Sequence, residues 1–246
     1  MVMSDDAFYS RTRLLLHDEG VERLRAAHVL VAGLGGVGGY AAEMLCRAGV
    51  GEMTIIDGDT VVESNINRQI IALHSTVGQP KTELFRQRLL DINPSLRLHA
   101  SQTFLRDELM IQMLEEFAGG VGARVVVDCI DTLSPKVFLL YHSVRLGLPV
   151  VSSMGSGGKV DPSLVQVGDI TESHSCPLAR GVRKRLHRMG IEGGIRVVFS
   201  PERVPEHAMI DDPGQNHRTT LGTISYIPPV FGCYLAAETI RMIIGN

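Results

Sequence analysis

The sequence GLGGVG occupies residues 33–38, directly after the apolar run 28–32, and the sequence IIDGD follows at residues 55–59. This order predicts a strand, a glycine-rich turn, a helix and a second strand that ends in an acid. Glycines allow the backbone to approach a phosphate chain, and the free N–H groups at the start of a helix attract its charge. A carboxylate at the end of the second strand can reach ribose hydroxyls. The nucleotide-binding residues predicted from this pattern are Gly33, Gly35, Gly36, Gly38 and Asp57.

The residues beyond the second strand favour ATP over a nicotinamide dinucleotide, which the glycine pattern alone would suit equally well. Asp57 is followed by Asp59, Asn65, Arg68 and Lys81, a set that includes two cations and an amide. A triphosphate has a use for these groups, whereas a dinucleotide dehydrogenase has no evident need of them. The alternative is that the two cations are solvated surface charges. Lys81, however, opens a predicted helix, where a cation is unfavourable unless an anion lies nearby, and this favours a phosphate role.

The composition is that of an ordinary globular protein. The chain has 246 residues, of which 44% are hydrophobic and 21% charged, so it is long enough for one large core. No compositional break divides it, and we expect a single domain over residues 1–246. The net charge of −3 means that a nucleic-acid partner must be met by a local basic patch.

The two ends of the chain predict neither export nor membrane insertion. Residues 1–13 are polar, without the apolar centre of a signal peptide. Residues 231–244 are apolar but include Glu238 and Arg241 and are too few to span a bilayer, so we expect a core helix there. We therefore expect no transmembrane segment and a cytoplasmic location.

The four cysteines lie far apart and form no CxxC pair. Because structural zinc needs closely spaced thiolates, we expect no zinc, and we expect reduced thiols in the absence of an export signal. Cys46 and Cys233 fall on apolar helices and are predicted to lie in the core, and Cys129 is predicted to be packed rather than reactive. Cys176 follows His174 in a polar loop, where an exposed thiol could capture an adenylated carboxylate as a thioester. The alternative is an inert loop thiol.

Short β-branched runs alternate with helical patterns through the first two thirds of the chain. The predicted strands are His28–Ala32, Met53–Ile56, Leu96–Ala100, Arg124–Asp128, Val150–Ser153 and Val165–Asp169. The predicted helices are Val37–Ala48, Lys81–Ile92, Asp107–Phe117, Ser134–Leu146 and Pro177–Met189. Near-continuous apolar strands are buried on both faces, which indicates a parallel sheet with helices on each side. We therefore predict an α/β fold with a Rossmann-like, doubly wound and mostly parallel sheet.

The pattern changes after Asp169. Residues 195–199 and 223–227 are predicted to be further strands, antiparallel additions that extend the sheet at its C-terminal end. Residues 201–220 are rich in Pro, Asp, Gly, Asn and His and have little periodicity, which predicts a flexible loop.

An early helix is predicted near residues 20–27, which would leave Arg11 and Arg13 on a mobile N-terminal arm. The expected parts of the domain are an arm and helix over residues 1–27, a nucleotide-binding core over 28–170 and a substrate-side extension over 171–246.

Acids follow several of the predicted strands, at the edge where open α/β sheets bind ligands. Asp131 comes just after the strand that ends at Asp128 and would suit Mg²⁺ bound to phosphate oxygens. The alternative is that Asp131 and Thr132 only cap the helix from Ser134. Asp128 itself is predicted to be structural.

The helix from Pro177 has one apolar stripe and is otherwise strongly basic. The stripe is formed by Leu178, Val182, Leu186 and Met189. The positive charges, with no acid among them, are Arg180, Arg183, Lys184, Arg185 and Arg188. Such a face is either merely solvated or a phosphate-binding surface for a nucleic acid. Aromatic residues make up only 5% of the chain, so contact with the backbone is favoured over base stacking.

Six short segments occur in one order along the first two thirds of the chain. They are Arg13 before LLL at 14–16, GLGGVG at 33–38, IDGD at 56–59, SNINRQ at 64–69, VGQPK at 77–81 and DCIDT at 128–132. Together they resemble the superfamily of ubiquitin-activating-like adenylating enzymes, which includes the bacterial activators of sulfur-carrier proteins in thiamine and molybdopterin synthesis. The resemblance extends over residues 9–170.

The resemblance implies ATP and Mg²⁺ as cofactors and a homodimeric enzyme. It implies that Asp57 holds the ribose and that Asp131 holds the magnesium ion. It implies that Asn65 and Arg68 bind the phosphates, with Lys81 near the α-phosphate. The N-terminal arginine would reach the ATP of the partner subunit. The implied catalytic residues are Arg13, Arg68, Lys81 and Asp131.

Within this superfamily, the second half of the chain resembles the tRNA threonylcarbamoyladenosine dehydratases. The similarity rests on GSGGKVDP at 155–162, on PLA at 177–179 with the basic helix after it, and on LGTISYIPP at 221–229. It implies ATP-dependent adenylation of the threonine carboxylate of threonylcarbamoyladenosine in tRNA. Attack by the neighbouring carbamoyl group would then close a ring and release AMP, and the basic helix would contact the tRNA.

The alternative substrate is the C-terminal glycine of a small ubiquitin-like sulfur-carrier protein, with a sulfur-relay protein as a further partner. Such activators usually hold zinc with two CxxC pairs, which this chain lacks. A non-catalytic nucleotide-binding module is disfavoured because Arg68, Lys81 and Asp131 are all present.

Overall fold

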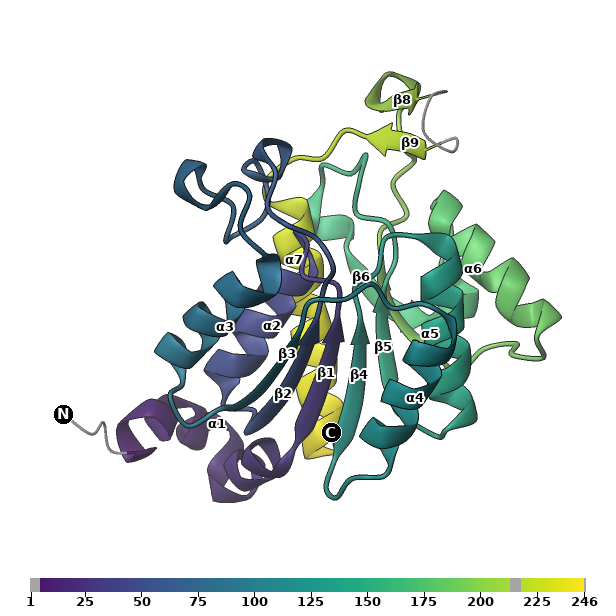
Figure 1. Ribbon diagram of the computed structural model, residues 1–246. Coiled ribbons are helices and arrows are strands. Elements are labelled where there is room, and N and C mark those ends of the chain that lie inside the picture. Colours follow the sequence, from purple (N-terminus) through teal and green to yellow (C-terminus); the bar gives the residue numbers. More distant parts are fainter. Residues whose placement is uncertain (1–4, 213–217, 246) are drawn as a thin grey trace.

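The central sheet has seven strands in the order β3-β2-β1-β4-β5-β7-β6 (Figure 1). The computed structural model describes residues 5–212 and 218–245. The strands of this sheet are β1 (His28–Ala32), β2 (Glu52–Ile56), β3 (Arg97–Ser101), β4 (Arg124–Asp128), β5 (Val150–Ser153), β6 (Gln166–Asp169) and β7 (Arg196–Phe199). Because β1 pairs with both β2 and β4, the direction of winding reverses beside β1, where such sheets open a crevice.

Every pairing in this sheet is parallel except that of β7 with β6. The predicted mostly parallel sheet with an antiparallel extension is confirmed. The prediction that residues 195–199 form an antiparallel addition is wrong in detail, because β7 runs parallel to β5 and β6 is the reversed strand at the edge. A helix lies between β5 and β7 in the chain, and helical crossovers join parallel strands.

Helices cover both faces of the sheet and form a separate core on each. They are α1 (Asp5–Ala26), α2 (Gly38–Ala48), α3 (Lys81–Ile92), α4 (Asp107–Ala118), α5 (Leu133–Arg145), α6 (Pro177–Arg188) and α7 (Ile227–Ile244). Side chains alternate along each strand, so Val29 and Val31 pack with α2, α3 and α7, whereas Leu30 and Ala32 pack with α4, α5 and α6.

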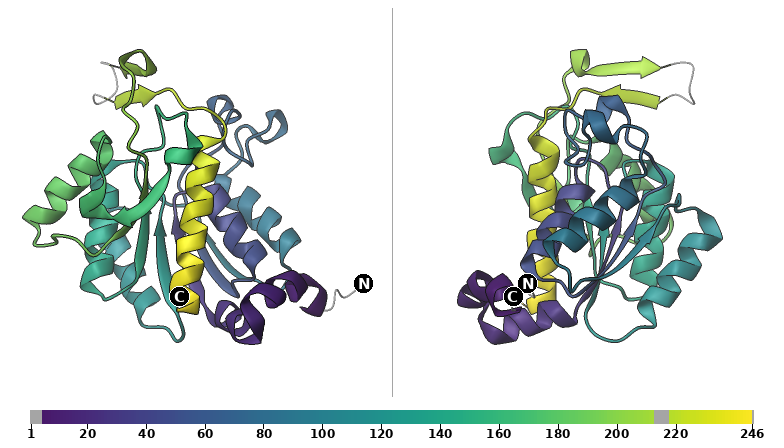
Figure 2. Two further views of the ribbon diagram at one scale, coloured as in Figure 1. Left: turned by 180° about the vertical axis from the view of Figure 1, so that it is seen from behind. Right: turned by 60° about the vertical axis from the view of Figure 1, so that its left-hand side comes forward.

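Helix α7 lies lengthwise along the sheet beside α2 (Figure 2). The two helices approach closely at Gly232, where a Cβ atom would lie 2.5 Å from the carbonyl oxygen of Val37. By length and composition α7 is the one described helix that could cross a membrane, but 50% of that apolar stretch is buried inside the protein. This burial fits the core helix predicted for residues 231–244.

The predicted strand over residues 223–227 is wrong, since α7 begins at Ile227 and has Pro228 in its first turn. A proline is well accommodated there because the first helical N–H groups have no partner within the helix.

Residues 201–220 contain regular structure that their composition did not reveal. The strands β8 (Met209–Asp212) and β9 (Arg218–Leu221) pair antiparallel and project beyond the carboxyl ends of the central strands (Figure 1). The prediction of a loop is therefore wrong for these strands, which are four residues each and too short for a clear alternation. Part of the predicted loop, residues 213–217, lies outside the described residues.

The N-terminal arm is also corrected. Arg11 and Arg13 lie within α1, which is kinked at His17 (φ 59°, ψ 179°). The Arg13 Nε atom lies 2.8 Å from a carboxylate oxygen of Asp18, just beyond the kink.

Glu43 links α2 to α3 and should make stability depend on pH. Its buried carboxylate accepts hydrogen bonds from Arg88 (2.5 Å) and Arg47 (2.9 Å). Burial alone would raise the pKa of Glu43, but these hydrogen bonds outweigh it and hold the pKa below its ordinary value of 4.5. A carboxyl group with a lowered folded-state pKa stabilises the protein above its unfolded-state pKa, and this stabilisation is lost as the pH falls through the folded value.

We therefore expect Glu43→Gln to lower the free energy of unfolding at neutral pH and to flatten its decline on acidification. Denaturant titrations at a series of pH values below about 5 measure both effects. Parallel pH profiles for the two proteins would contradict the assignment.

Candidate active site

The glycine-rich turn joins β1 to α2 at the carboxyl edge of the sheet. Gly33 has φ 91°, and a Cβ atom there would lie 2.9 Å from the carbonyl oxygen of Cys129. A Cβ atom at Gly38 would lie 1.8 Å from the Gly33 carbonyl oxygen, so neither position admits a side chain. No side chain in the described part of the protein caps the start of α2, which leaves backbone N–H groups there available to an anion.

Asp57 lies at the end of β2 and points at this turn. One carboxylate oxygen accepts the Leu34 N–H (2.7 Å), and the other accepts the Asp59 N–H (2.8 Å). Burial raises the pKa of Asp57, against the opposing effects of Lys81 and of these N–H groups. The carboxylate is thus held beside the glycine-rich turn, where a ribose would follow a bound phosphate chain.

Lys81 opens α3 and joins this group from the other side. Its Nζ lies 2.9 Å from a carboxylate oxygen of Asp59 and 3.9 Å from one of Asp57, and the side chain is 5% exposed. The two carboxylates supply the anion that a cation at a helix start requires. The position of Lys81 in its helix therefore does not by itself require a phosphate, contrary to the sequence argument. Its proximity to Asp57 nevertheless places an ammonium group at the predicted site.

Arg68 contacts the glycine-rich turn from the loop after β2. A Cβ atom at Gly36 would lie 3.2 Å from Arg68 Cγ, so the stem of the arginine lies across the turn. Its guanidinium donates to the Ser64 carbonyl (2.9 Å). Asn65 is buried, and its Oδ1 accepts the Val62 N–H (3.2 Å), which closes the same loop.

Gln69 has a buried side-chain oxygen without a partner in the described part of the chain. The only sequence signal for this residue was its place in the SNINRQ segment. The residue is 6% exposed, and its Oε1 atom is buried with no hydrogen-bond partner in the described part of the chain. Its Nε2 lies 3.8 Å from the position of a Cβ at Gly35. An unpaired buried acceptor costs about 1–3 kcal/mol, so a donor from a ligand at the turn would relieve this cost.

The segment 128–132 brings two aspartates with different environments to the same edge. Asp128 is fully buried, and one oxygen accepts hydrogen bonds from Lys136 and Ser152, each 2.6 Å long. Its other oxygen accepts the Ile130 N–H (3.0 Å), consistent with the structural role predicted for it.

Asp131 is exposed and follows this anchored turn. Mg²⁺ is commonly held by one or two carboxylates together with substrate phosphates, and a single exposed carboxylate fits that mode. Within the described residues no three His, Cys, Asp or Glu side chains gather into a metal-binding group.

Arg13 is not brought to the glycine-rich turn of its own chain. Helix α1 packs at the opposite edge of the sheet, where the Leu24 carbonyl accepts the Gly51 N–H (3.0 Å) just before β2 (Figures 1 and 2). A role for Arg13 at an ATP site therefore requires a second subunit.

Cys176 is buried, so the exposed nucleophile considered from the sequence is not found, and the alternative of an inert thiol fits the structure. It occupies the N-cap of α6, where Sγ accepts the Ala179 N–H at 3.4 Å. The same sulfur accepts the Gly155 N–H at 3.3 Å, which ties α6 to the turn after β5. These contacts give the thiol a structural role, and they place it away from solvent.

The other cysteines divide between core and surface. Cys46 is buried as predicted, and burial raises its pKa to about 12. Burial also raises the pKa of Cys129. The core prediction is wrong for Cys233, which is exposed because the residues of α7 that face the sheet lie at other positions, such as Phe231 and Leu235.

Lys159 is a buried cation that no local sequence pattern marks as functional. It is 1% exposed, and its Nζ donates to the backbone carbonyls of Glu202 and Ser175 (3.4 Å to the latter). Burial lowers the pKa of Lys159. The residue holds three segments together around the turn after β5, and only its place in the GSGGKVDP segment signalled it.

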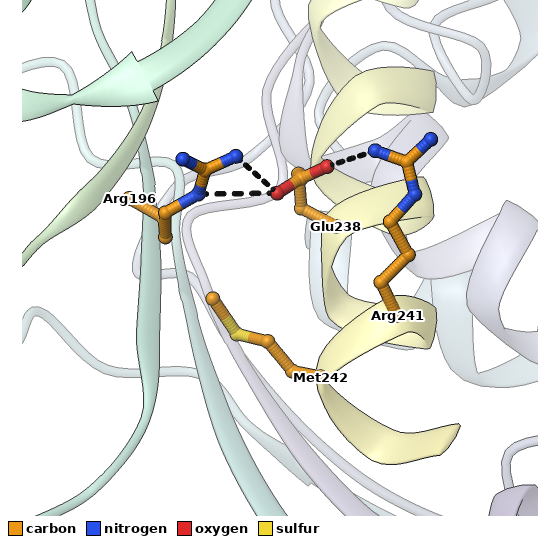
Figure 3. A pocket seen from close by; sticks show the side chains of 4 residues that line it. All are labelled: Arg196, Glu238, Arg241 and Met242. Atoms are coloured by element: carbon orange, nitrogen blue, oxygen red, sulfur yellow. Dashed lines mark hydrogen bonds and ion pairs between the residues drawn. The ribbon is translucent and has the colours of Figure 1, made fainter. Parts of the chain in front are cut away.

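A depression of about 490 Å³ lies near the start of β7 and the end of α7 (Figure 3). The Glu238 carboxylate accepts hydrogen bonds there from Arg196 (2.9 Å) and Arg241 (2.6 Å), and Met242 completes the lining. Because β7 runs parallel to β5, its first residue marks the edge of the sheet opposite to the glycine-rich turn. The depression is thus separate from the predicted nucleotide site.

The ThiF family model matches residues 9–246. The chain belongs to the ThiF family. It is 41% identical over 194 residues to the tRNA threonylcarbamoyladenosine dehydratase of Bacillus subtilis, a match that covers 79% of this chain and 74% of that protein. It is 37% identical over 188 residues to the Escherichia coli dehydratase, covering 75% and 68% of the two chains.

A solved structure matches the whole fold. The crystal structure of the E. coli tRNA N6-threonylcarbamoyladenosine dehydratase in complex with ATP has a TM-score of 0.86 and 31% identity, covering 100% of this chain and 98% of that one. The AMP complex gives a TM-score of 0.85. Another relative, the molybdopterin-synthase adenylyltransferase of Salmonella typhimurium, is 39% identical over 134 residues, 54% of this chain and 51% of that protein.

Proposed function

We propose that this protein is an ATP-dependent dehydratase that acts on threonylcarbamoyladenosine in tRNA. The observation that carries the proposal is the strand-edge cluster in which Asp57, Lys81 and Arg68 surround an uncapped glycine-rich turn. The full-length similarity to a dehydratase crystallised with ATP and with AMP supports both the nucleotide and the substrate class.

The proposed reaction has two steps. A carboxylate oxygen of the threonine moiety attacks the α-phosphorus of ATP, and pyrophosphate leaves as the acyl–AMP bond forms. The neighbouring carbamoyl group then attacks the activated carbonyl carbon, a ring closes, and AMP departs with the original carboxylate oxygen. The carbamoyl group gives up a proton, so the substrate loses one water in total. No enzyme nucleophile is required, in agreement with the burial of Cys176.

The residues of the cluster stabilise charge in this scheme. The backbone N–H groups at the start of α2 face the phosphates, and Asp57 accepts the ribose hydroxyls. Lys81 exchanges its contact with Asp59 for the α-phosphate, where negative charge builds up during attack. Arg68 and Asn65 bind the remaining phosphates, and Gln69 accepts a hydrogen bond from the nucleotide.

Asp131 is the residue that would hold Mg²⁺ in this proposal. The ion, when bound, neutralises charge on the phosphate oxygens. The exposure of Asp131 beside the anchored Asp128 turn suits that task.

The substrate class can be tested by pyrophosphate release, because adenylation of either carboxylate frees pyrophosphate, whereas an adenylated carrier keeps its AMP. Purified protein with ATP is given either tRNA that carries threonylcarbamoyladenosine or a ubiquitin-like sulfur carrier with a C-terminal glycine. We expect stimulation by the modified tRNA alone. Stimulation by the carrier alone would instead indicate the alternative function, an activator of sulfur-carrier proteins. We propose a cytoplasmic location for either function.

We further propose that the enzyme is a homodimer in which Arg13 reaches the ATP of the partner subunit. Leu14 and Leu15 follow Arg13 and are 83% and 79% exposed, an apolar pair that a partner subunit would cover. Arg13→Ala subunits and Asp131→Ala subunits should each be inactive alone.

Mixing these two variants is expected to restore part of the activity, because each heterodimer contains one intact composite site. Turnover is measured after subunit exchange has been verified with differently tagged subunits. Inactive mixtures that contain heterodimers would rule out a shared site.

A further inference from the structure

The structure divides the five basic residues of α6 into two groups. The Arg183 guanidinium is partly buried and donates to both the backbone carbonyl and the hydroxyl of Ser173. The Arg185 guanidinium donates to the Ser134 hydroxyl on α5 (2.7 Å). The other three basic side chains are exposed and form no hydrogen bond or ion pair with the described part of the chain. These are Arg180, Lys184 and Arg188.

The three unpaired cations form one row along the helix. They are spaced four residues apart, so they lie on one face at intervals of about 6 Å. The buried residues Val182 and Leu186 project from the opposite face, and the two paired arginines lie on the flanks between the faces. The row therefore points directly away from the core.

A row of like charges destabilises the helix that bears it, and a bound anion would relieve this repulsion. Like charges four residues apart destabilise a helix by about 0.2–0.5 kcal/mol per pair, and no acid in α6 offsets this effect. Evenly spaced cations along a straight rod suit successive phosphates of one nucleic-acid strand, which are likewise evenly spaced charges. A tRNA backbone has this property.

Helix α6 is also fixed relative to the proposed active site. Its first turn is tied to the loop after β5 through the Cys176 sulfur and the Gly155 N–H. Arg185 ties its last turns to Ser134, three residues after Asp131. The helix thus starts at the carboxyl edge of the sheet and runs outward from it (Figure 1).

We infer that Arg180, Lys184 and Arg188 form a phosphate-binding row for the tRNA backbone, whereas Arg183 and Arg185 hold α6 in place. This inference rests on the proposed function and deepens it, because it states where the tRNA leaves the active site. One nucleotide enters at the sheet edge, and the adjoining backbone follows the row along α6.

Two double variants with the same change of charge test the division. Arg180→Gln/Arg188→Gln removes two members of the row, and Arg183→Gln/Arg185→Gln removes the two paired arginines. Binding of unmodified tRNA transcript is measured over a range of salt concentrations. The row variant should lower the slope of log affinity against log salt by about 0.7–0.9 for each phosphate that is no longer neutralised, and it should weaken all tRNAs alike.

The paired variant should keep most of this slope and instead lower the thermal unfolding midpoint, and neither variant should change ATP affinity. Equal reductions of slope in the two variants, or no reduction in the row variant, would overturn the inference. So would row variants that lose binding to phosphatidylserine vesicles but not to tRNA.

Wild-type protein that binds tRNA and releases AMP with the modified tRNA keeps the proposed function intact in all these cases. Wild-type protein that fails to do so refutes the proposed function directly.

Discussion

Lys81→Ala is expected to reduce ATP-dependent turnover by about 100- to 1,000-fold, because one preorganised charge on the transferring phosphate is removed. The Lys81 ammonium lies between Asp57 and Asp59 at the glycine-rich turn and is nearly inaccessible to solvent. In the proposed mechanism no solvated cation can take its place beside the α-phosphate. AMP formation with modified tRNA at saturating ATP gives the measurement.

Asp131→Ala is expected to reduce ATP-dependent turnover by a similar factor without affecting the fold, because the Asp131 side chain is exposed.

Removal of Lys81 leaves two neighbouring carboxylates, so thermal unfolding of Lys81→Ala is measured alongside its activity. Arg86→Ala is the matched control, since Arg86 lies on the same helix as Lys81 but pairs with Glu83 at the surface. Near-wild-type turnover in a folded Lys81→Ala or Asp131→Ala protein would remove that residue from the mechanism.

Lys136→Met is expected to lower the free energy of unfolding by about 3–5 kcal/mol, because it leaves a buried carboxylate without its cation. Both side chains of the Asp128–Lys136 pair are 0% exposed, and their contact is 2.6 Å. Asp128 also accepts the Ile130 N–H, so the turn that leads to Asp131 should shift in the same variant. Denaturant unfolding gives the stability, and residual ATP affinity reports on the turn.

The double variant Asp128→Leu/Lys136→Met separates charge from packing. It removes both ions, so it should recover part of the stability that Lys136→Met lacks. A double variant less stable than Lys136→Met would mean that the hydrogen bonds of Asp128 to Ser152 and Ile130 matter more than the unpaired charge.

The order of strands and helices could be predicted from the sequence because the buried face of a strand or helix requires apolar residues at regular spacings along the chain. The strand over residues 28–32 and the helix over residues 81–92 have the predicted bounds. The period fails where elements are short or only partly buried. It did not reveal the four-residue strands β8 and β9, and it suggested a strand where α7 begins.

The nucleotide-binding pattern was also readable, since a glycine-rich turn and the acid on the next strand lie close in the sequence. The structure brings Asp57, Lys81 and Arg68 to that turn. Their assigned roles stay predictions, as does the role of Asp131. The sequence could not show that Lys81 is already neutralised by aspartates, because that contact joins a strand end to a separate helix.

The sequence by itself determined the fold class, the position of the nucleotide-binding turn and the charge of α6, all of which depend on residues near one another in the chain. Only the tertiary structure decided which cations of α6 are free, that Cys176 is buried, that Cys233 is exposed and that Arg13 lies at the far edge of the sheet. These properties depend on partners distant in sequence, such as Ser134 for Arg185. A local pattern indicates on which face of a helix or strand a residue lies. Only the packing of several elements determines which other residues that face contacts.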